Sequence, residues 1–235
     1  MAQPATLRVA VLANTLPAAL KVYEELRDAP GLRLYIILCR APFESRPRFL
    51  FKHAARLVTS RGRRASLRLM LARRVFIVQR PLDDPQSLKL LSRLNLDIGL
   101  HKVGVIYREA TIAAFRLGIL NPHIGLLPRY RGRAVLEWSL LEGRPTGITV
   151  FFIDAGIDTG ERIVLREEID VSHCRSIQEA KSYLFNLDAR FFRRALEKLR
   201  EDGFTHHIND TLAGRRYYVM SKLFQNVAEE VLNTE

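Results

Sequence analysis

The fold of this chain is decided by the stretch Gly118-Ile-Leu-Asn-Pro-His-Ile-Gly-Leu-Leu-Pro-Arg-Tyr-Arg-Gly132. A second stretch of the same kind follows it, Ile148-Thr-Val-Phe-Phe-Ile-Asp-Ala-Gly-Ile-Asp-Thr-Gly160. Each begins as a short apolar strand and runs into a loop punctuated by glycine or proline. Because ligands of open α/β sheets collect at the carboxyl ends of strands, the two junctions predict one shared site.

Three polar side chains stand at these junctions: Asn121, His123 and Asp158. A carboxamide offers N–H donors that do not titrate, an imidazole carries a proton near neutral pH, and a carboxylate orients the imidazole. Together they predict a site that stabilises an oxyanion and moves a proton. Taken singly, the three residues also fit a strand-end contact, a core histidine and an Asx-turn.

The amino-terminal part predicts a parallel sheet. Leu7–Ala13 reads as a buried strand, 17–27 as a helix with proline in its first turn, and Leu32–Leu38 as a second strand. A strand-helix-strand opening of this kind indicates an α/β fold. The loop from Ala13 to Pro17 contains no glycine, so it is neither a dinucleotide fingerprint nor a phosphate-binding loop.

The remaining elements alternate in the same way. Further predicted strands are 75–78, 97–104, 118–121, 148–153 and 161–169, and further predicted helices are 85–94, 108–117, 133–142 and 176–201. Residues 204–208 and 215–220 predict two antiparallel strands that form a hairpin with a turn at Asn209-Asp210. Ser221 is placed to cap a last short helix.

Most of the positive charge lies in one segment. The chain has 235 residues and a formal net charge of +12. Between Arg40 and Arg74 arginine and lysine recur, with Glu44 as the one acidic residue, and apolar residues occur between them at roughly helical spacing. We predict one or two basic amphipathic helices that either cover the domain as a solvated insert or contact nucleotide phosphates, RNA or an anionic surface.

Composition predicts a globular protein. Apolar residues make up 48% and charged residues 26% of the chain, which is ordinary for a globular domain. We expect no signal peptide and no transmembrane helix, because no apolar run approaches about 20 residues. Cys39 and Cys174 are too few for a disulfide framework, and we expect reduced thiols and a cytoplasmic location.

Asn-x-His-x-x-Leu-Leu-Pro-x-Tyr-Arg-Gly at 121–132, followed by Asp-x-Gly-x-Asp-Thr-Gly at 154–160, resembles the formyltransferase family that uses 10-formyltetrahydrofolate. That family includes methionyl-tRNA formyltransferase, glycinamide ribonucleotide formyltransferase and the sugar N-formyltransferases. The resemblance implies a Rossmann-like domain with a mostly parallel twisted sheet, at residues 1–201. It also implies a folate cosubstrate, no metal, and Asn121, His123 and Asp158 as catalytic residues.

The resemblance places other residues around the two cosubstrates. It implies that the folate pocket is lined by Val103, Gly104, Val105, Ile106, Ile153, Asp154, Gly156 and Ile157. We expect Asp154 to cap its turn rather than to catalyse. Residues expected to contact the acceptor are Asn14, Arg129, Tyr130 and Arg131, although the three loop residues also fit a solvated rim.

The acceptor is predicted less directly. Transfer-RNA formylation in this family normally accompanies a second domain of about a hundred residues, whereas few residues follow Glu201. Residues 202–235 are similar to the carboxyl-terminal hairpin with which sugar-nucleotide N-formyltransferases form dimers. We therefore expect a small, nucleotide-linked amine and a homodimer. The alternatives are a tRNA acceptor, favoured by the basic segment 40–74, and a non-catalytic module that binds folate or nucleic acid.

Overall fold

The computed structural model describes residues 6–40 and 74–234. The predicted basic segment 40–74 therefore lies outside the described residues except at its two ends. The chain divides into two compact units, Met1–Leu120 and Asn121–Glu235. None of the helices within the described ranges has the length and apolar character needed to cross a bilayer.

The first unit is built on a parallel sheet with the strand order β3-β2-β1-β4-β5. Its elements are β1 (Leu7–Ala13), α1 (Leu16–Leu26), β2 (Leu32–Cys39), β3 (Val75–Val78), α4 (Pro85–Leu94), β4 (Leu96–Lys102), α5 (Glu109–Ala113) and β5 (Phe115–His123), the last of which continues into the second unit. Strands β1 and β2 are mostly apolar and are buried over most of their length, as expected for strands covered on both faces. The predicted α/β opening is confirmed.

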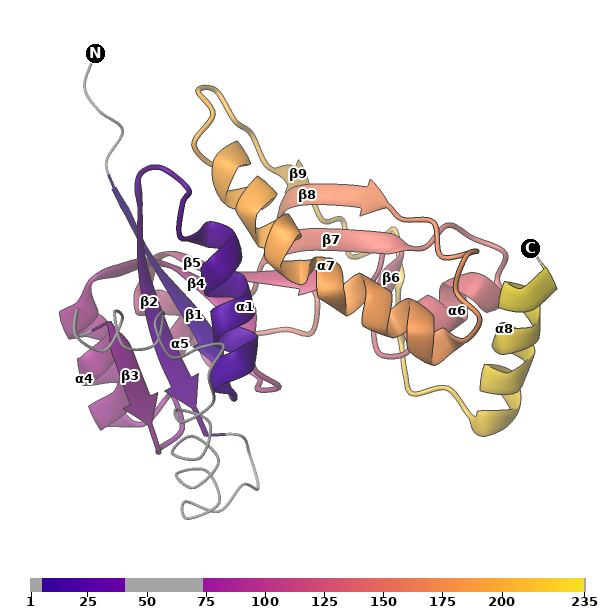
Figure 1. The fold of residues 1–235 in the computed structure, drawn as a ribbon, viewed down its shortest axis with the longest axis horizontal. Helices are drawn as coiled ribbons and strands as arrows, with labels where there is room; N and C mark the ends of the chain where they lie inside the picture. Colours follow the sequence, from indigo (N-terminus) through magenta and orange to yellow (C-terminus); the bar gives the residue numbers. More distant parts are fainter. Residues whose placement is uncertain (1–5, 41–73, 235) are drawn as a thin grey trace. The chain divides into compact units, whose positions relative to one another are not determined.

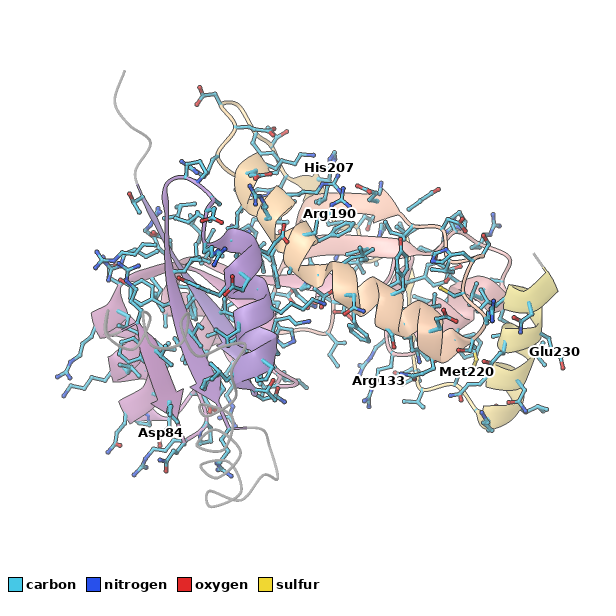
Figure 2. The ribbon with its side chains drawn as sticks, in the orientation of Figure 1. Asp84, Arg133, Arg190, His207, Met220 and Glu230 are labelled. Carbon is cyan, nitrogen blue, oxygen red and sulfur yellow. The ribbon has the colours of Figure 1, made fainter. Side chains whose placement is uncertain are left out.

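Two helices of this unit begin at side-chain caps. The Thr15 hydroxyl accepts from the amide of Ala18, and the Asp84 carboxylate accepts from the amide of Gln86. Asp84, whose side chain is labelled in Figure 2, directly precedes α4. In each case the side chain satisfies an amide that has no partner inside the helix. The predicted helix 108–117 is too long: α5 ends at Ala113, because Phe115 already pairs with Leu96 as the start of β5.

The second unit contains a short antiparallel ladder. Its elements are β6 (Tyr130–Gly132), α6 (Val135–Leu141), β7 (Gly147–Phe152), β8 (Arg162–Glu168), α7 (Ile177–Lys198), β9 (His207–Ile208), β10 (Arg215–Tyr217) and α8 (Lys222–Thr234). Strand β8 pairs antiparallel with β7 on one side and with β9 on the other. The long helix α7 runs along β7 and β8 (Figure 1), and α8 packs against α6.

The predicted carboxyl-terminal hairpin is wrong in its pairing. Strand β9 pairs with β8, whereas β10 pairs parallel with β6, so the two predicted strands do not pair with each other. Glycines allow β10 to approach the earlier loop closely. A methyl group on Gly132 would lie 2.2 Å from the Tyr217 carbonyl oxygen, and one on Gly214 would lie 1.9 Å from the Pro128 carbonyl oxygen. The predicted division at residue 201 stays a prediction.

Candidate active site

Strand β5 brings Asn121 and His123 to the start of the second unit. Residues two apart in a strand point to the same face of the sheet, so the carboxamide and the imidazole lie on one face. The Asn121 side chain is half-buried, and His123 is 7% exposed. The strand extends two residues beyond the predicted end at Asn121, and His123 is therefore held by regular backbone rather than by a loop.

The His123 ring is oriented by two oxygen atoms. Its Nε2 lies 2.7 Å from the carbonyl oxygen of Tyr130. A carbonyl oxygen only accepts hydrogen bonds, so Nε2 must carry the hydrogen. The other ring nitrogen, Nδ1, lies 3.6 Å from Oδ2 of Asp158. The nitrogen that faces the carboxylate is therefore the one left free to gain or lose a proton.

Asp158 is held in an uncommon backbone conformation. Its φ of 53° lies in the left-handed region, which aspartate tolerates better than most residues. The amide of Gly132 donates to Asp158 Oδ2 at 2.9 Å. The carboxamide of Asn209 donates to the Asp158 carbonyl at 3.2 Å and to the Gly160 carbonyl at 3.1 Å. Backbone strain that is fixed by its surroundings in this way occurs often at functional sites.

The predicted site residues Asn121, His123 and Asp158 all belong to the second unit, and the structure brings His123 and Asp158 together. A carboxylate at 3.6 Å attracts the charge of an imidazolium in this mostly buried setting. Hydrogen bonds between catalytic groups commonly tighten when a substrate binds. The arrangement provides a proton carrier, a charged partner and a carboxamide donor.

Asp154 has the structural role that the sequence predicts. Its Oδ1 accepts from the Gly156 amide at 2.9 Å and from the Thr159 hydroxyl at 2.7 Å. These contacts close the turn after β7, which confirms that Asp154 shapes the loop that carries Asp158.

The three loop residues expected at the acceptor lie in different environments. Arg129 is exposed. Tyr130 is 1% exposed and donates from its hydroxyl to Glu142 at 2.9 Å, whereas Arg131 donates from Nη2 to the carbonyls of Thr211 and Gly214. The side chains of Tyr130 and Arg131 therefore hold the second unit together, and the expectation that they grip an acceptor does not fit this placement.

The predicted folate residues of the first unit surround the end of β4. Val103 is buried, and a methyl group on Gly104 would meet no atom within 4 Å. Val105 and Ile106 line a cavity of about 200 Å³ that Thr111 also lines. The Thr111 hydroxyl is buried and has no hydrogen-bond partner among the described residues. The other lining residues are Cys39, Arg40, Arg80, Pro81, Leu82, Asp83, Tyr107 and Arg108. Asn14 is half-buried after β1.

Sequence reasoning missed the residues that hold the site together: Asn209, Glu142 and the Gly132 amide. Asn209-Asp210 reads as a turn in the sequence, and no local pattern connects it to a loop 51 residues earlier.

Among residues 6–40 and 74–234, no group of three or more His, Cys, Asp or Glu side chains is arranged to hold a metal ion.

Comparison with known proteins finds a matching family. The model of the formyl transferase family matches residues 52–196, a range that includes Asn121, His123 and Asp158. Methionyl-tRNA formyltransferase from Caldanaerobacter subterraneus is 34% identical over 121 residues, which are 51% of this chain and 39% of that protein. The chain spans about two fifths of the length of the curated relatives it matches.

Solved structures share the fold. A sugar N-formyltransferase from a Shewanella species superposes with a TM-score of 0.64 at 12% identity, covering 97% of this chain and 88% of that chain. Glycinamide ribonucleotide transformylase 1 from Symbiobacterium toebii gives a TM-score of 0.62 at 19% identity, covering 88% and 96%. The predicted α/β, Rossmann-like fold with a mostly parallel sheet is confirmed.

Proposed function

Because the chain belongs to the formyl transferase family, we propose that it transfers a formyl group from 10-formyltetrahydrofolate to a primary amine. The observation that carries the proposal is the placement of His123 Nδ1 beside Asp158 Oδ2, with Asn121 two residues earlier on the same strand face. These are the residues that the family motif singles out. The match also argues against a non-catalytic module, since such a module would not need all three groups.

Attack of an amine on the formyl carbon of the donor places negative charge on the formyl oxygen. The Asn121 carboxamide donates an N–H to that oxygen, and the loss of one such donor typically costs about 3 kcal/mol. His123 gains and loses its proton at Nδ1, because Nε2–H is committed to the Tyr130 carbonyl. Asp158 balances the charge of the imidazolium and accepts the amine proton directly or through water. As the tetrahedral intermediate collapses, the bond between the formyl carbon and the donor nitrogen breaks, and that nitrogen takes up the proton and leaves as tetrahydrofolate.

The donor is proposed to bind along residues 103–106 of the first unit, and the expected contribution of Ile153, Asp154, Gly156 and Ile157 stays a prediction. The open space at Gly104 suits a flat ligand that approaches the backbone closely. Saturating 10-formyltetrahydrofolate, or a non-transferable folate analogue, is expected to raise the melting temperature by mass action. A folded protein whose melting temperature does not change would count against the donor.

For the acceptor we favour the amine of a nucleotide-linked sugar. Support comes from the solved structure described as a sugar N-formyltransferase, which covers most of this chain, and from Arg129, which is exposed in the loop after β5. The expected contact of Asn14 with the acceptor stays a prediction. The second candidate is methionyl-tRNA, because the curated relatives carry that name and because residues 40–74 are strongly basic.

Separate assays with each kind of acceptor distinguish the two candidates. The purified chain is incubated with labelled 10-formyltetrahydrofolate and either a panel of amino-sugar nucleotides or charged initiator tRNA, at 50 and 200 mM salt. A sugar acceptor predicts labelled formamido sugar and a turnover number that changes little with salt. Formylation of tRNA, with a steep loss of affinity at 200 mM salt, would favour the second candidate.

A further inference from the structure

We propose that residues 207–217 act as a clamp that sets the distance between His123 and Asp158, with Asn209 and Tyr217 as its positioning residues. The inference rests on the proposed function, since it assigns these residues to the same reaction. Neither side chain bonds to His123 or to the Asp158 carboxylate. The Asn209 side chain bonds to the loop that carries Asp158, and the Tyr217 hydroxyl bonds to Glu142, which also accepts from Tyr130 of β6.

Asn209 holds the loop that carries Asp158. Asn209 is only 2% exposed. Both hydrogens of its carboxamide nitrogen are donated, one to the Asp158 carbonyl and one to the Gly160 carbonyl. Its own amide donates to the Glu161 carbonyl at 2.9 Å. Three hydrogen bonds from one residue thus fix the backbone from 158 to 161 and stabilise the left-handed conformation of Asp158.

The Asn209 carboxamide makes these contacts although its own oxygen accepts no hydrogen bond from the described residues. Oδ1 of Asn209 is buried and has no hydrogen-bond partner among the described residues. A buried acceptor without a partner costs roughly 1–3 kcal/mol. Turning the carboxamide over would bring its oxygen against two carbonyl oxygens, so the orientation is fixed by the loop. The loop geometry is therefore maintained at a cost in stability, as is common for functional sites.

Tyr217 holds the other half of the site. Strand β10 pairs with β6, and the ring of Tyr217 stacks on the ring of Tyr130 with a centroid distance of 5.3 Å. Both tyrosine hydroxyls donate to the carboxylate of Glu142, and Arg215 forms an ion pair with the same carboxylate. This network fixes the backbone of β6.

The backbone of β6 is the part of the molecule that orients the catalytic pair. The Tyr130 carbonyl accepts from His123 Nε2, and the Gly132 amide donates to Asp158 Oδ2. One end of the clamp therefore fixes the Asp158 loop, and the other fixes the strand that contacts both catalytic side chains. A misplacement of about 1 Å in such a pair can cost on the order of 10²-fold in rate.

The test compares two positioning variants with two matched controls. Asn209→Ala removes the contacts to the Asp158 loop, and Tyr217→Phe keeps the stacked ring but removes the hydroxyl. The controls are Asn226→Ala, an exposed asparagine on α8, and Tyr218→Phe, the neighbouring tyrosine that is 65% exposed. We expect kcat to fall by about 10- to 100-fold in the first two with both KM values within about threefold, and no change in the controls.

A second readout does not depend on activity. The imidazole nitrogen resonances of His123 are assigned by nuclear magnetic resonance with His123→Gln as the reference. We expect these resonances to move in Asn209→Ala and in Tyr217→Phe. In Tyr217→Phe we also expect the hydrogen on His123 Nε2 to exchange faster with water. The controls are expected to match the wild type.

The two readouts separate the clamp from the proposed function. A wild type that transfers no formyl group to any acceptor would defeat the proposed function, and the clamp would then be judged by the His123 resonances alone. Unchanged resonances together with wild-type kcat in both variants would overturn the clamp. Equal losses of kcat in the two positioning variants and the two controls would also overturn the clamp. If Asn209→Ala does not fold, Tyr217→Phe decides the question.

Discussion

At the scale of single residues, the hydrogen bond from His123 Nε2 to the Tyr130 carbonyl determines how the imidazole can act. It leaves Nδ1 as the nitrogen that exchanges a proton, on the side where Asp158 lies. Asn121 and His123 follow from the sequence motif, but the direction of the ring does not. It depends on a backbone carbonyl seven residues later and on the conformation of the loop between.

Gly125 tests this orientation by a steric change. A methyl group there would lie 2.6 Å from His123 Nε2 and 2.9 Å from the Tyr130 carbonyl oxygen, so it must displace one of them. Gly125→Ala is expected to lower kcat by at least about 10-fold, because the hydrogen bond that fixes the ring is broken. Steady-state kinetics with a parallel melting curve measure this. Wild-type kcat in a folded variant would show that the ring orientation is not needed.

At the scale of elements, the strongly periodic parts of the chain could be predicted and the short contacts between distant segments could not. The strands β1, β2, β4, β7 and β8 and the helices α1, α4 and α7 lie close to their predicted ranges. Their apolar patterns are long enough to fix the type of element. Strand β6 was not predicted, because three residues carry no period and its pairing with β10 depends on residues about 85 positions away.

Glu142 allows the β6–β10 connection to be tested by pH. Burial of the carboxylate opposes ionisation, but hydrogen bonds from Tyr217, Tyr130 and Arg215 outweigh it, so the pKa of Glu142 lies below its ordinary value of 4.5. Its contribution to stability is therefore complete above about pH 4.5 and is lost as the pH falls through the lowered pKa.

Glu142→Gln removes this dependence. We expect the variant to melt below the wild type at pH 7 and the gap between their melting temperatures to narrow as the pH falls from 5 to 3. Thermal denaturation by circular dichroism at four pH values measures the gap. A gap that stays constant or widens on acidification would contradict the role given to the carboxylate.

At the scale of the whole molecule, each compact unit contains one buried cysteine. Burial raises the pKa of Cys39 in the first unit to about 12. The pKa of Cys174 in the second unit is also raised, first by burial and then by the charges of Glu179 and Asp170. Both thiols therefore stay protonated at pH 8, and only thiolates react readily with alkylating agents.

Alkylation can thus report on the opening of each unit separately. With iodoacetamide at pH 8, we expect native protein to react at neither cysteine within an hour, and unfolded protein in guanidinium chloride to react at both. Peptide mass spectrometry identifies each site. Rapid reaction of Cys39 or Cys174 in native protein would show that its unit opens or packs less tightly than described.

The central claim is that Asn121, His123 and Asp158 carry formyl transfer. The most direct measurement is the initial rate of tetrahydrofolate release from 10-formyltetrahydrofolate in the presence of the amine acceptor. Each of Asn121→Ala, His123→Ala and Asp158→Ala is expected to lower kcat by at least about 10²-fold while the fold survives. Asp154→Asn, which changes the neighbouring turn residue, is expected to cost far less. A His123→Ala variant that transfers the formyl group at the wild-type rate would contradict the claim.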